Sequence, residues 1–359
     1  MLRAGDPVDL RSDLLAAQGD VMSEATRPKE GLGLLEQAAA LLEKAGAAVS
    51  GSPLAARLAD VTLHAGGATW RTGDETGAIA LNRKAIALYR QLYGPDSPSE
   101  AFGWHNLGEV ERVAGKLDDA LEAFRTAVRI REARLGDSPN LALSIAGVGS
   151  VLSDQKHWKE GLAAYERAQR IDRALLPADD LQQVPAMIGR ARAMVHLDML
   201  QDAARGYQET VALMDRAGVR TTNLGITIHN LAELMTKLGR CEDALGSYRR
   251  AIAVFEEARG KDAGILLYPL VGEGRCLLSQ RRSTDAIAPL ERARQLKVSG
   301  SAAGVAAQGR FFLGRALVES GRDRKRSLAD ARAARDVAAA AGIEPDDLRE
   351  MDGWLASHH

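Results

Sequence analysis

The sequence predicts an all-α chain, an α-α superhelix of about eight helical hairpins with a C-terminal capping helix. Two observations predict this fold class. The phrase at residues 119–128 recurs almost unchanged at 243–252, and a related phrase lies at 159–168. Aromatic residues make up only 4% of the chain, so Ala, Leu, Val and Ile must close the core at short range. A repeated unit with a small-residue core is typical of stacked helices.

The copies of this phrase keep a regular step. The positions equivalent to Ala120 are 31, 78, 120, 161, 203, 244, 286 and 327, separated by 41 or 42 residues after a first step of 47. A small residue, then an aromatic or Leu four positions on, then Ala three further on share one stripe of a helix. About 40 residues leave room for two helices. We therefore expect repeats over residues 1–342, followed by a capping helix and tail over 343–359.

Each hairpin is expected to contain a first helix, a turn, a second helix and a linker. The first helix is clearest at 104–110 and 228–234, where small Gly or Ala residues allow close approach of a neighbour. Breaker-rich turns with acidic residues follow at 114–119 and 238–243, and acidic residues suit the start of a second helix. The linker at 94–98 begins with Gly and ends with Pro, which suits the end of one helix and the start of the next.

The first-helix and second-helix residues together resemble the tetratricopeptide repeat. The residues that carry this resemblance are Trp104, Leu107, Gly108, Ala120, Phe124 and Ala127. The long step and the Gly-x-x-x-Pro linker resemble the kinesin light chain type of the repeat. The resemblance implies a solenoid that binds protein partners, and it implies no cofactor.

The last segment resembles the repeat region that follows the catalytic domain in large bacterial serine/threonine kinases. The resemblance rests on 309–317, 321–326 and 352–356. It implies a regulatory arm associated with kinase signalling. The chain itself contains no Gly-rich phosphate loop, no His-Arg-Asp and no Asp-Phe-Gly, so we predict that it is not an enzyme.

Net charge and cysteine content limit the partners and the cellular compartment that we expect for this protein. The formal net charge is −1, so a nucleic-acid or anionic-lipid surface is not expected. Two cysteines, Cys241 in a predicted turn and Cys276 in a first helix, cannot form a disulfide framework and fit a reducing compartment. The start at 1–15 is not a secretory signal, and no apolar run is long enough to span a membrane. A cytoplasmic, bacterial protein is expected, with a monomer favoured.

Groove-facing positions of the first helices give the candidate binding residues. Two repeats offer near-duplicate sets. These sets are Phe102, His105, Asn106, Glu109 and Arg112 in one repeat, and Ile226, His229, Asn230, Glu233 and Lys237 in the other. An Asn amide can both donate to and accept from an extended peptide backbone. The kinesin-light-chain resemblance implies this role for Asn106 and Asn230. The alternative is that they cap or bridge neighbouring helices.

Other groove positions carry cations or aromatic rings. Arg192, Arg275 and Arg315 share one position in different repeats, either as a cationic ladder for a carboxylate-bearing partner or as ordinary solvated side chains. Tyr268 and Trp70 complete the set. The pairs His105 with Glu109 and His229 with Glu233 have metal-ligand spacing, but two ligands are too few, so no metal is predicted. A rival hypothesis is that the terminal helix near Trp354, or a second copy, closes the groove.

Overall fold

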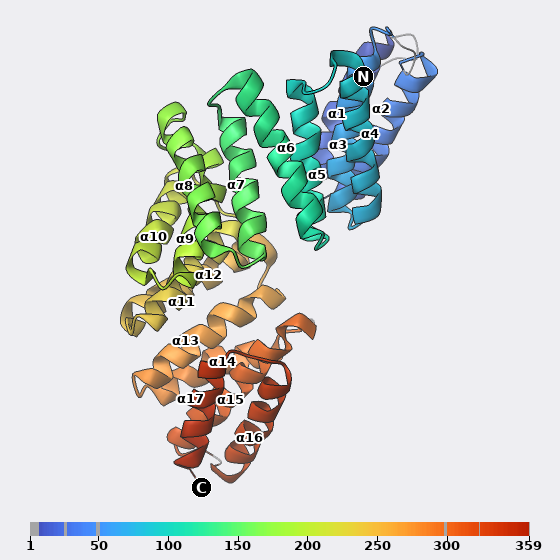
Figure 1. Cartoon of the computed structure of the whole chain (residues 1–359). Coiled ribbons are helices and arrows are strands. Elements are labelled where there is room, and N and C mark those ends of the chain that lie inside the picture. The colour runs from blue at the N-terminus through green and yellow to red at the C-terminus, as the bar shows by residue number, and fades with distance from the viewer. Residues whose placement is uncertain (1–6, 25–26, 48–50, 298–299, 323, 359) are drawn as a thin grey trace. The chain divides into compact units, whose positions relative to one another are not determined.

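The computed structural model describes residues 7–24, 27–47, 51–297, 300–322 and 324–358, so the predicted start at 1–15 and the tail ending at 359 lie partly outside them. Within these ranges the chain forms seventeen α-helices, three short 3₁₀ turns and no strand (Figure 1). The helices are α1 Val8–Glu24, α2 Pro28–Lys44, α3 Ala55–Arg71, α4 Glu75–Tyr93, α5 Pro98–Val113, α6 Leu117–Leu135, α7 Pro139–Asp154, α8 Trp158–Leu175, α9 Val184–His196, α10 Leu200–Arg216, α11 Thr222–Lys237, α12 Cys241–Arg259, α13 Leu267–Ser279, α14 Ser283–Gln295, α15 Ala303–Glu319, α16 Arg324–Ala340 and α17 Pro345–Ala356. The predicted all-α class is confirmed.

The predicted repeat step sets the helix boundaries. Each position equivalent to Ala120 is the fourth residue of an even-numbered helix, and each is buried. These residues are Gly31, Ala78, Ala120, Gly161, Ala203, Ala244, Ala286 and Ser327. A small residue at this place lets the second helix of a hairpin lie close to the first. The sequence period therefore marks a packing requirement that recurs in every hairpin.

The linkers stop one hairpin and start the next as predicted. Gly94 follows α4 with a φ of 78°, a conformation that suits glycine. Ser97 precedes α5, and its hydroxyl accepts a hydrogen bond of 3.2 Å from the backbone N–H of Glu100. Pro98 is the first residue of that helix. The predicted turn at 238–243 is three residues too long, because α12 begins at Cys241, and Cys241 therefore lies in a helix.

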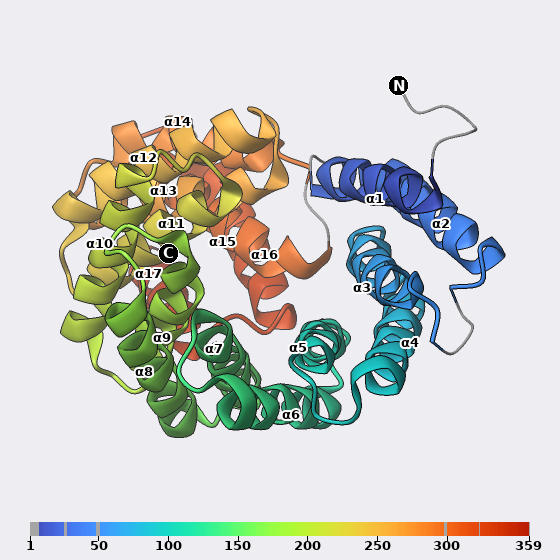
Figure 2. The ribbon, with the colours of Figure 1, turned by 90° about the horizontal axis from the view of Figure 1, so that it is seen from above.

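The described residues divide into two compact units. Unit 1 contains the described residues up to Ala178 and Pro185–Leu197, and unit 2 contains Asp179–Val184 and the described residues from Asp198 onward. In unit 1, α3, α5 and α7 lie along one side, with α4, α6 and α8 along the other (Figure 2). Neighbouring odd-numbered helices also touch one another, α5 with α7 in unit 1 and α13 with α15 in unit 2. We call the exposed surface of the odd-numbered helices of one unit its inner face.

Glycines on the odd-numbered helices receive the rings of the even-numbered helices. A Cβ on Gly147 of α7 would lie 2.4 Å from the ring of Phe124, which is fully buried. Gly108 of α5 borders the same ring from the other side. In unit 2, a Cβ on Gly272 would lie 2.4 Å from the ring of Tyr248. The absence of a side chain at these positions is therefore what allows one aromatic ring to fill the space between adjacent hairpins.

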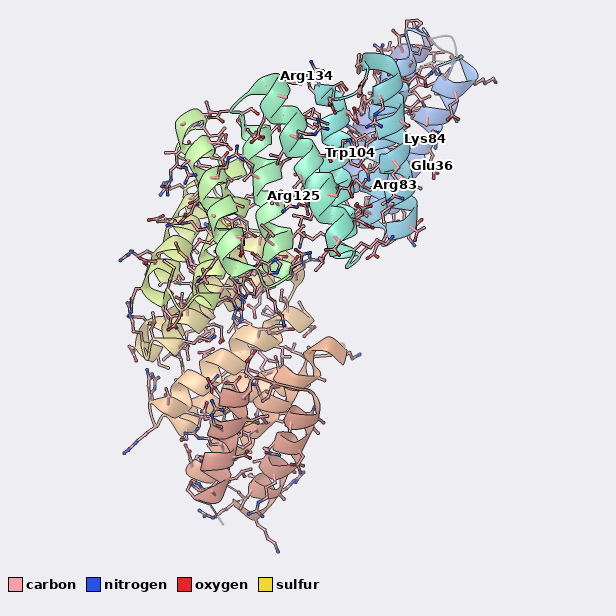
Figure 3. All side chains as sticks on the ribbon, in the orientation of Figure 1. Glu36, Arg83, Lys84, Trp104, Arg125 and Arg134 are labelled. Carbon is pink, nitrogen blue, oxygen red and sulfur yellow. The ribbon has the colours of Figure 1, made fainter. Side chains whose placement is uncertain are left out.

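Buried carboxylates fix the odd-numbered helix α5 against its neighbour α4. Glu111 of α5 is buried and forms an ion pair of 3.0 Å with Arg83 of α4. Glu100 of α5 is fully buried, forms an ion pair with Arg90 of α4, and accepts a hydrogen bond of 2.9 Å from the indole N–H of Trp104 in its own helix. Figure 3 shows Trp104 on α5 and Arg83 on α4. These contacts hold the helix whose exposed side forms part of the inner face of unit 1.

Candidate binding surface

The two candidate asparagines have free side-chain amides. Asn106 lies on α5 in unit 1 and Asn230 on α11 in unit 2, and both are partly exposed. Among the described residues, none forms a hydrogen bond with either amide. The alternative in which they cap or bridge neighbouring helices therefore has no contact to support it. Each amide keeps its donors and its acceptor for another molecule.

Apolar side chains accompany these asparagines. Phe102 is 40% exposed and lies one turn before Asn106 on α5. Ile226 has the same relationship to Asn230 on α11 and is 37% exposed. Residues four apart share one helical face, so each amide has an apolar neighbour on its own face. A free amide beside an exposed apolar side chain provides both hydrogen bonding and burial for a ligand.

The two predicted aromatic groove residues differ in their surroundings. Tyr268 on α13 is 36% exposed, and its ring meets the ring of His229 edge to face with 6.1 Å between centroids. Trp70 instead packs against a buried apolar cluster in unit 1 that includes Ile79 and Leu107. Tyr268 is thus available at the inner face of unit 2, whereas Trp70 mainly stabilises the packing between hairpins.

His105 is part of the packing between helices of unit 1. Its Nδ1 lies 3.2 Å from the Ser144 hydroxyl of α7, and its ring meets Phe124 edge to face at 5.4 Å. Burial, followed by the nearby Arg131 charge, lowers the pKa of His105 to about 3. The imidazole is therefore neutral at physiological pH. A neutral His105 bridges α5 and α7 rather than offering a charge to a ligand.

His229 and Glu233 belong to a polar cluster in unit 2. The Tyr248 hydroxyl donates to Glu233 Oε1 at 2.6 Å and lies 3.0 Å from the Thr236 hydroxyl. Burial, followed by the Glu233 charge, raises the pKa of Tyr248, so it remains a donor. Burial also lowers the pKa of His229, whose Nδ1 has no hydrogen-bond partner among the described residues. One oxygen of the Glu233 carboxylate is therefore already hydrogen-bonded within unit 2.

The cations of unit 1 meet an acidic side chain of the same unit. Arg112 on α5 contacts Asp154 at 2.9 Å, and it also contacts Glu109 at 3.4 Å. Arg192 on α9 lies 3.8 Å from the same Asp154 carboxylate. The equivalent cation of unit 2, Lys237, is exposed at the end of α11. Arg112 and Arg192 thus share one carboxylate instead of standing as free charges.

The two arginines of unit 2 hold the C-terminal helix. Arg275 on α13 forms ion pairs with Asp347 at 2.8 Å and with Glu350 at 2.7 Å, both on α17. Arg315 on α15 contacts Glu350 at 3.3 Å. The repeat positions of these arginines predict either a ladder for a carboxylate-bearing partner or ordinary solvated side chains. In the structure the carboxylates come from the chain itself, and Asp347 and Glu350 are site residues that the repeat pattern could not reveal.

Apolar contacts accompany these ion pairs. Met351 of α17 is fully buried and Trp354 is 8% exposed. The Trp354 ring meets the ring of Phe311 on α15 edge to face, with 5.6 Å between centroids. Its indole N–H donates to Glu319 at 3.0 Å. α17 is therefore docked on the odd-numbered helices of unit 2 by both apolar burial and charge.

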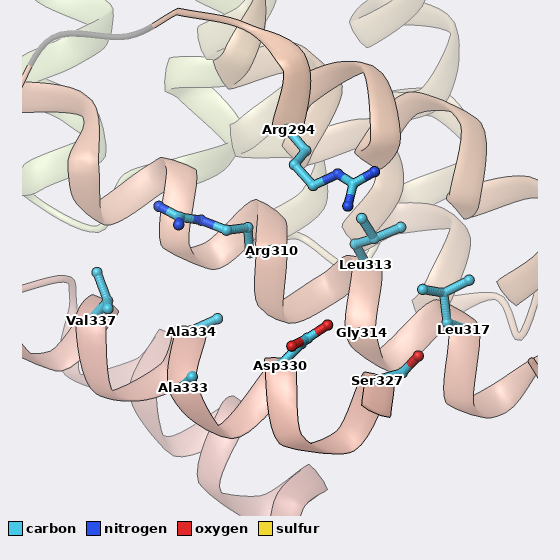
Figure 4. Close-up of a pocket in the computed structure, with 10 residues that line it drawn as sticks. All are labelled: Arg294, Arg310, Leu313, Gly314, Leu317, Ser327, Asp330, Ala333, Ala334 and Val337. Atoms are coloured by element: carbon cyan, nitrogen blue, oxygen red, sulfur yellow. The ribbon is translucent and has the colours of Figure 1, made fainter. Parts of the chain in front are cut away.

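A separate pocket lies in unit 2, and none of the predicted binding residues lines it. Its walls come from α14, α15 and α16 (Figure 4). Leu313, Leu317 and Val337 give it an apolar lining, and Arg310 and Asp330 add opposite charges.

No described group of three or more His, Cys, Asp or Glu side chains could hold a metal ion. No described helix has the length and apolar character that crossing a membrane requires.

Comparison with known proteins identifies the repeats. The tetratricopeptide repeat family model matches residues 57–133 and 224–297, which span α3 to α6 and α11 to α14. These two stretches are tetratricopeptide repeats, and the prediction from the motif is confirmed. The tetratricopeptide fold suggests a scaffold for protein–protein interaction.

Solved structures share this fold at low sequence identity. The Rap protein complexed with Competence and Sporulation Factor is 14% identical with a TM-score of 0.55, covering 97% of this chain and 99% of that one. Yeast Tom70 is 14% identical with a TM-score of 0.54, covering 99% of this chain and 66% of that one. BtubC from P. vanneervenii is 18% identical with a TM-score of 0.52, covering 66% and 93%. At these identities the similarity shows the fold alone.

Curated proteins also match this chain by sequence, at low identity. A clustered mitochondria protein homolog of Emericella nidulans is 22% identical over 207 residues, which cover 57% of this chain and 17% of that protein. The secreted RxLR effector protein RXLR-C07 of Plasmopara halstedii is 23% identical over 233 residues, covering 63% and 68%. The chain spans less than a fifth of the clustered mitochondria protein homolog.

Proposed function

We propose that this chain is a non-catalytic scaffold whose inner faces bind an extended segment of a partner protein. The observation that carries the proposal is the free amide at the same repeat position in both units, Asn106 and Asn230. Each has an exposed apolar side chain one turn earlier, Phe102 or Ile226. An extended peptide presents alternating backbone donors and acceptors, which a free amide can pair with.

Preorganisation supports this mode of binding. His105 is held by Ser144 and Phe124, so the helix beside Asn106 is fixed before a ligand arrives. A rigid wall loses little conformational entropy on binding, and only the peptide must be ordered. The Rap structure is of a complex with Competence and Sporulation Factor, which is consistent with a repeat chain of this fold holding a ligand.

Unit 2 also favours a second candidate function, closure of its inner face by the chain's own C-terminal helix. The supporting observation is the docking of Asp347 and Glu350 on Arg275 and Arg315. Under this alternative, part of unit 2 is structural and partner binding is centred on Asn106 in unit 1. The cytoplasmic location and the association with a bacterial kinase remain predictions from the sequence.

The test starts from peptides selected on the whole chain from a random peptide library. The affinity of a selected peptide is then measured for the wild type, Asn106→Ala, Asn230→Ala and the double variant. Loss of one amide hydrogen bond of about 1 kcal/mol predicts that the double variant binds about fivefold more weakly, as does the single variant that lacks the contacted asparagine. Gln208→Ala is the matched control, because Gln208 is an exposed amide of unit 2 on the even-numbered helix α10, outside the inner face.

The control should bind as the wild type does, and all variants should keep the helical circular dichroism signal. Equal affinity of the wild type and the double variant would contradict the proposal and place the binding site elsewhere. Loss of binding by Asn230→Ala alone, with Asn106→Ala unaffected, would contradict the alternative that centres binding on unit 1.

A further inference from the structure

The two cysteines of the chain meet in unit 2. Cys241 is the first residue of α12, and Cys276 lies on α13, 35 residues later. Both are free thiols, and their Sγ atoms lie 2.7 Å apart. The bond of a disulfide is about 2.05 Å long, so a small movement would bring the sulfurs to bonding distance. The second helix of one hairpin and the first helix of the next bring them together.

The two thiols differ in their access to solvent. Cys276 is fully buried, and burial together with the hydrogen bond to Cys241 raises its pKa to about 12. Cys241 is partly exposed and lines a surface pocket with Arg240 and Ser279. The Ser279 hydroxyl donates to Cys241 Sγ at 3.2 Å. Cys241 is therefore the thiol that a soluble reagent can reach first, and Cys276 is positioned to react second.

We propose that Cys241 and Cys276 form a reversible modification site, a dithiol that is oxidised to an intramolecular disulfide by a low-molecular-weight disulfide. The Cys241 thiolate attacks one sulfur of the reagent, which forms a mixed disulfide and releases one thiolate. Cys276 then attacks Cys241 Sγ, its proton passes to the second departing thiolate, and the second reagent thiol leaves. The protein loses two hydrogen atoms and the reagent disulfide gains them.

The disulfide would join two adjacent hairpins beside the docked C-terminal helix. Cys241 belongs to the hairpin of α11 and α12, and Cys276 to the hairpin of α13 and α14. Arg275, the residue before Cys276, holds Glu350 of α17, and both line the same pocket as Cys241. Oxidation would therefore restrain the part of the inner face on which α17 docks. Closing a loop of this length also restricts the unfolded chain, which raises the unfolding temperature of unit 2.

The experiment treats the folded full-length protein with oxidised glutathione and counts free thiols and glutathione adducts by intact mass. The wild type should lose both thiols, carry no adduct, and recover both thiols with dithiothreitol. Cys276→Ala should retain one glutathione on Cys241, because the second step is missing. Cys241→Ser should keep Cys276 free, because that thiol is buried. The unfolding temperature should rise on oxidation in the wild type and not in either variant.

Several outcomes would overturn the proposal. Two glutathione adducts on the wild type would show that the thiols react independently. Two free thiols after prolonged treatment would show that Cys241 is not reactive, and a disulfide-linked dimer would show that the pair joins separate chains. A thiol count on the reduced, denatured wild type verifies that both cysteines are present before treatment. The wild-type result does not depend on whether either variant folds.

Discussion

Arg275 on α13 and Glu350 on α17 form an ion pair of 2.7 Å, although 75 residues separate them in sequence. Their side chains are only 31% and 32% exposed. Arg315 contacts the same carboxylate, so two odd-numbered helices of unit 2 converge on one acidic residue. Glu350 of the C-terminal helix thus binds these arginines in the way that a carboxylate of a partner would.

Replacing Glu350 should loosen α17 without unfolding unit 2. Glu350→Gln removes the charge at a partly buried pair, at a cost of about 1–2 kcal/mol. Amide hydrogen exchange in α17 should accelerate by about 5–30-fold, because that is the change in open population for this free energy. Met351 and Trp354 keep apolar contact with the unit, so the helix should remain docked most of the time.

The matched control for this variant is Arg349→Gln on the same helix. The Arg349 side chain is 72% exposed and contacts only Asp346 in its own helix among the described residues. Its exchange rates should match those of the wild type. Equal exchange in Glu350→Gln and the wild type would show that apolar contacts alone hold α17.

Gly147 and Gly33 should respond oppositely to alanine. A Cβ at Gly147 would lie 2.4 Å from the buried Phe124 ring, so Gly147→Ala should destabilise unit 1 by about 1–3 kcal/mol. Gly33 lies inside α2 and has no heavy atom near its Cβ direction, so Gly33→Ala should stabilise by about 0.5–1 kcal/mol. Urea unfolding followed by tryptophan fluorescence measures both, and a similar effect of the two changes would contradict the packing described for Phe124.

The stability of unit 1 should fall as the pH drops below about 6.5. His105 has a pKa of about 3 when folded, because of burial and the Arg131 charge, and about 6.5 when unfolded. Between these values the unfolded state binds the extra proton, so stability is complete above about pH 6.5 and is lost toward pH 3. At pH 5 the loss is at most about 2 kcal/mol.

His105→Gln tests this pH dependence. The difference in unfolding free energy between pH 7 and pH 5 should be smaller in the variant than in the wild type. Arg131→Met is a second check, because removal of the cation should raise the pKa of His105 in an NMR titration. The same pH dependence in the wild type and His105→Gln would mean that folding does not lower the pKa of His105.

The repeat architecture could be predicted because it rests on local periodicity. A small residue is needed wherever two helices of a hairpin touch, so Ala120 and its equivalents mark every hairpin, even where the residue is Gly31 or Ser327. The linker prediction succeeded at Gly94 and Pro98 for a similar reason. Glycine and proline restrict the backbone independently of the rest of the chain.

The partners of the candidate site residues could not be predicted from periodicity. The contact of Arg275 with Glu350 joins a repeat to a helix outside the repeat pattern. The repeat position places Asn106 and Arg112 on one helix. It does not show that Arg112 forms an ion pair with Asp154 while the Asn106 amide has no partner among the described residues. The approach of Cys241 to Cys276 likewise depends on how the start of α12 packs against the first helix of the next hairpin.

The most direct test of peptide binding at the inner face is site-specific photo-cross-linking of a selected peptide to the full-length chain. Benzoylphenylalanine is placed at Phe102, which is exposed on α5 one turn from Asn106, or at Arg125, which is exposed on α6 (Figure 3). If the peptide binds at the inner face, we expect cross-links from position 102 that excess unlabelled peptide abolishes, and none from position 125. Cross-linking from position 125 alone would contradict binding at the inner face.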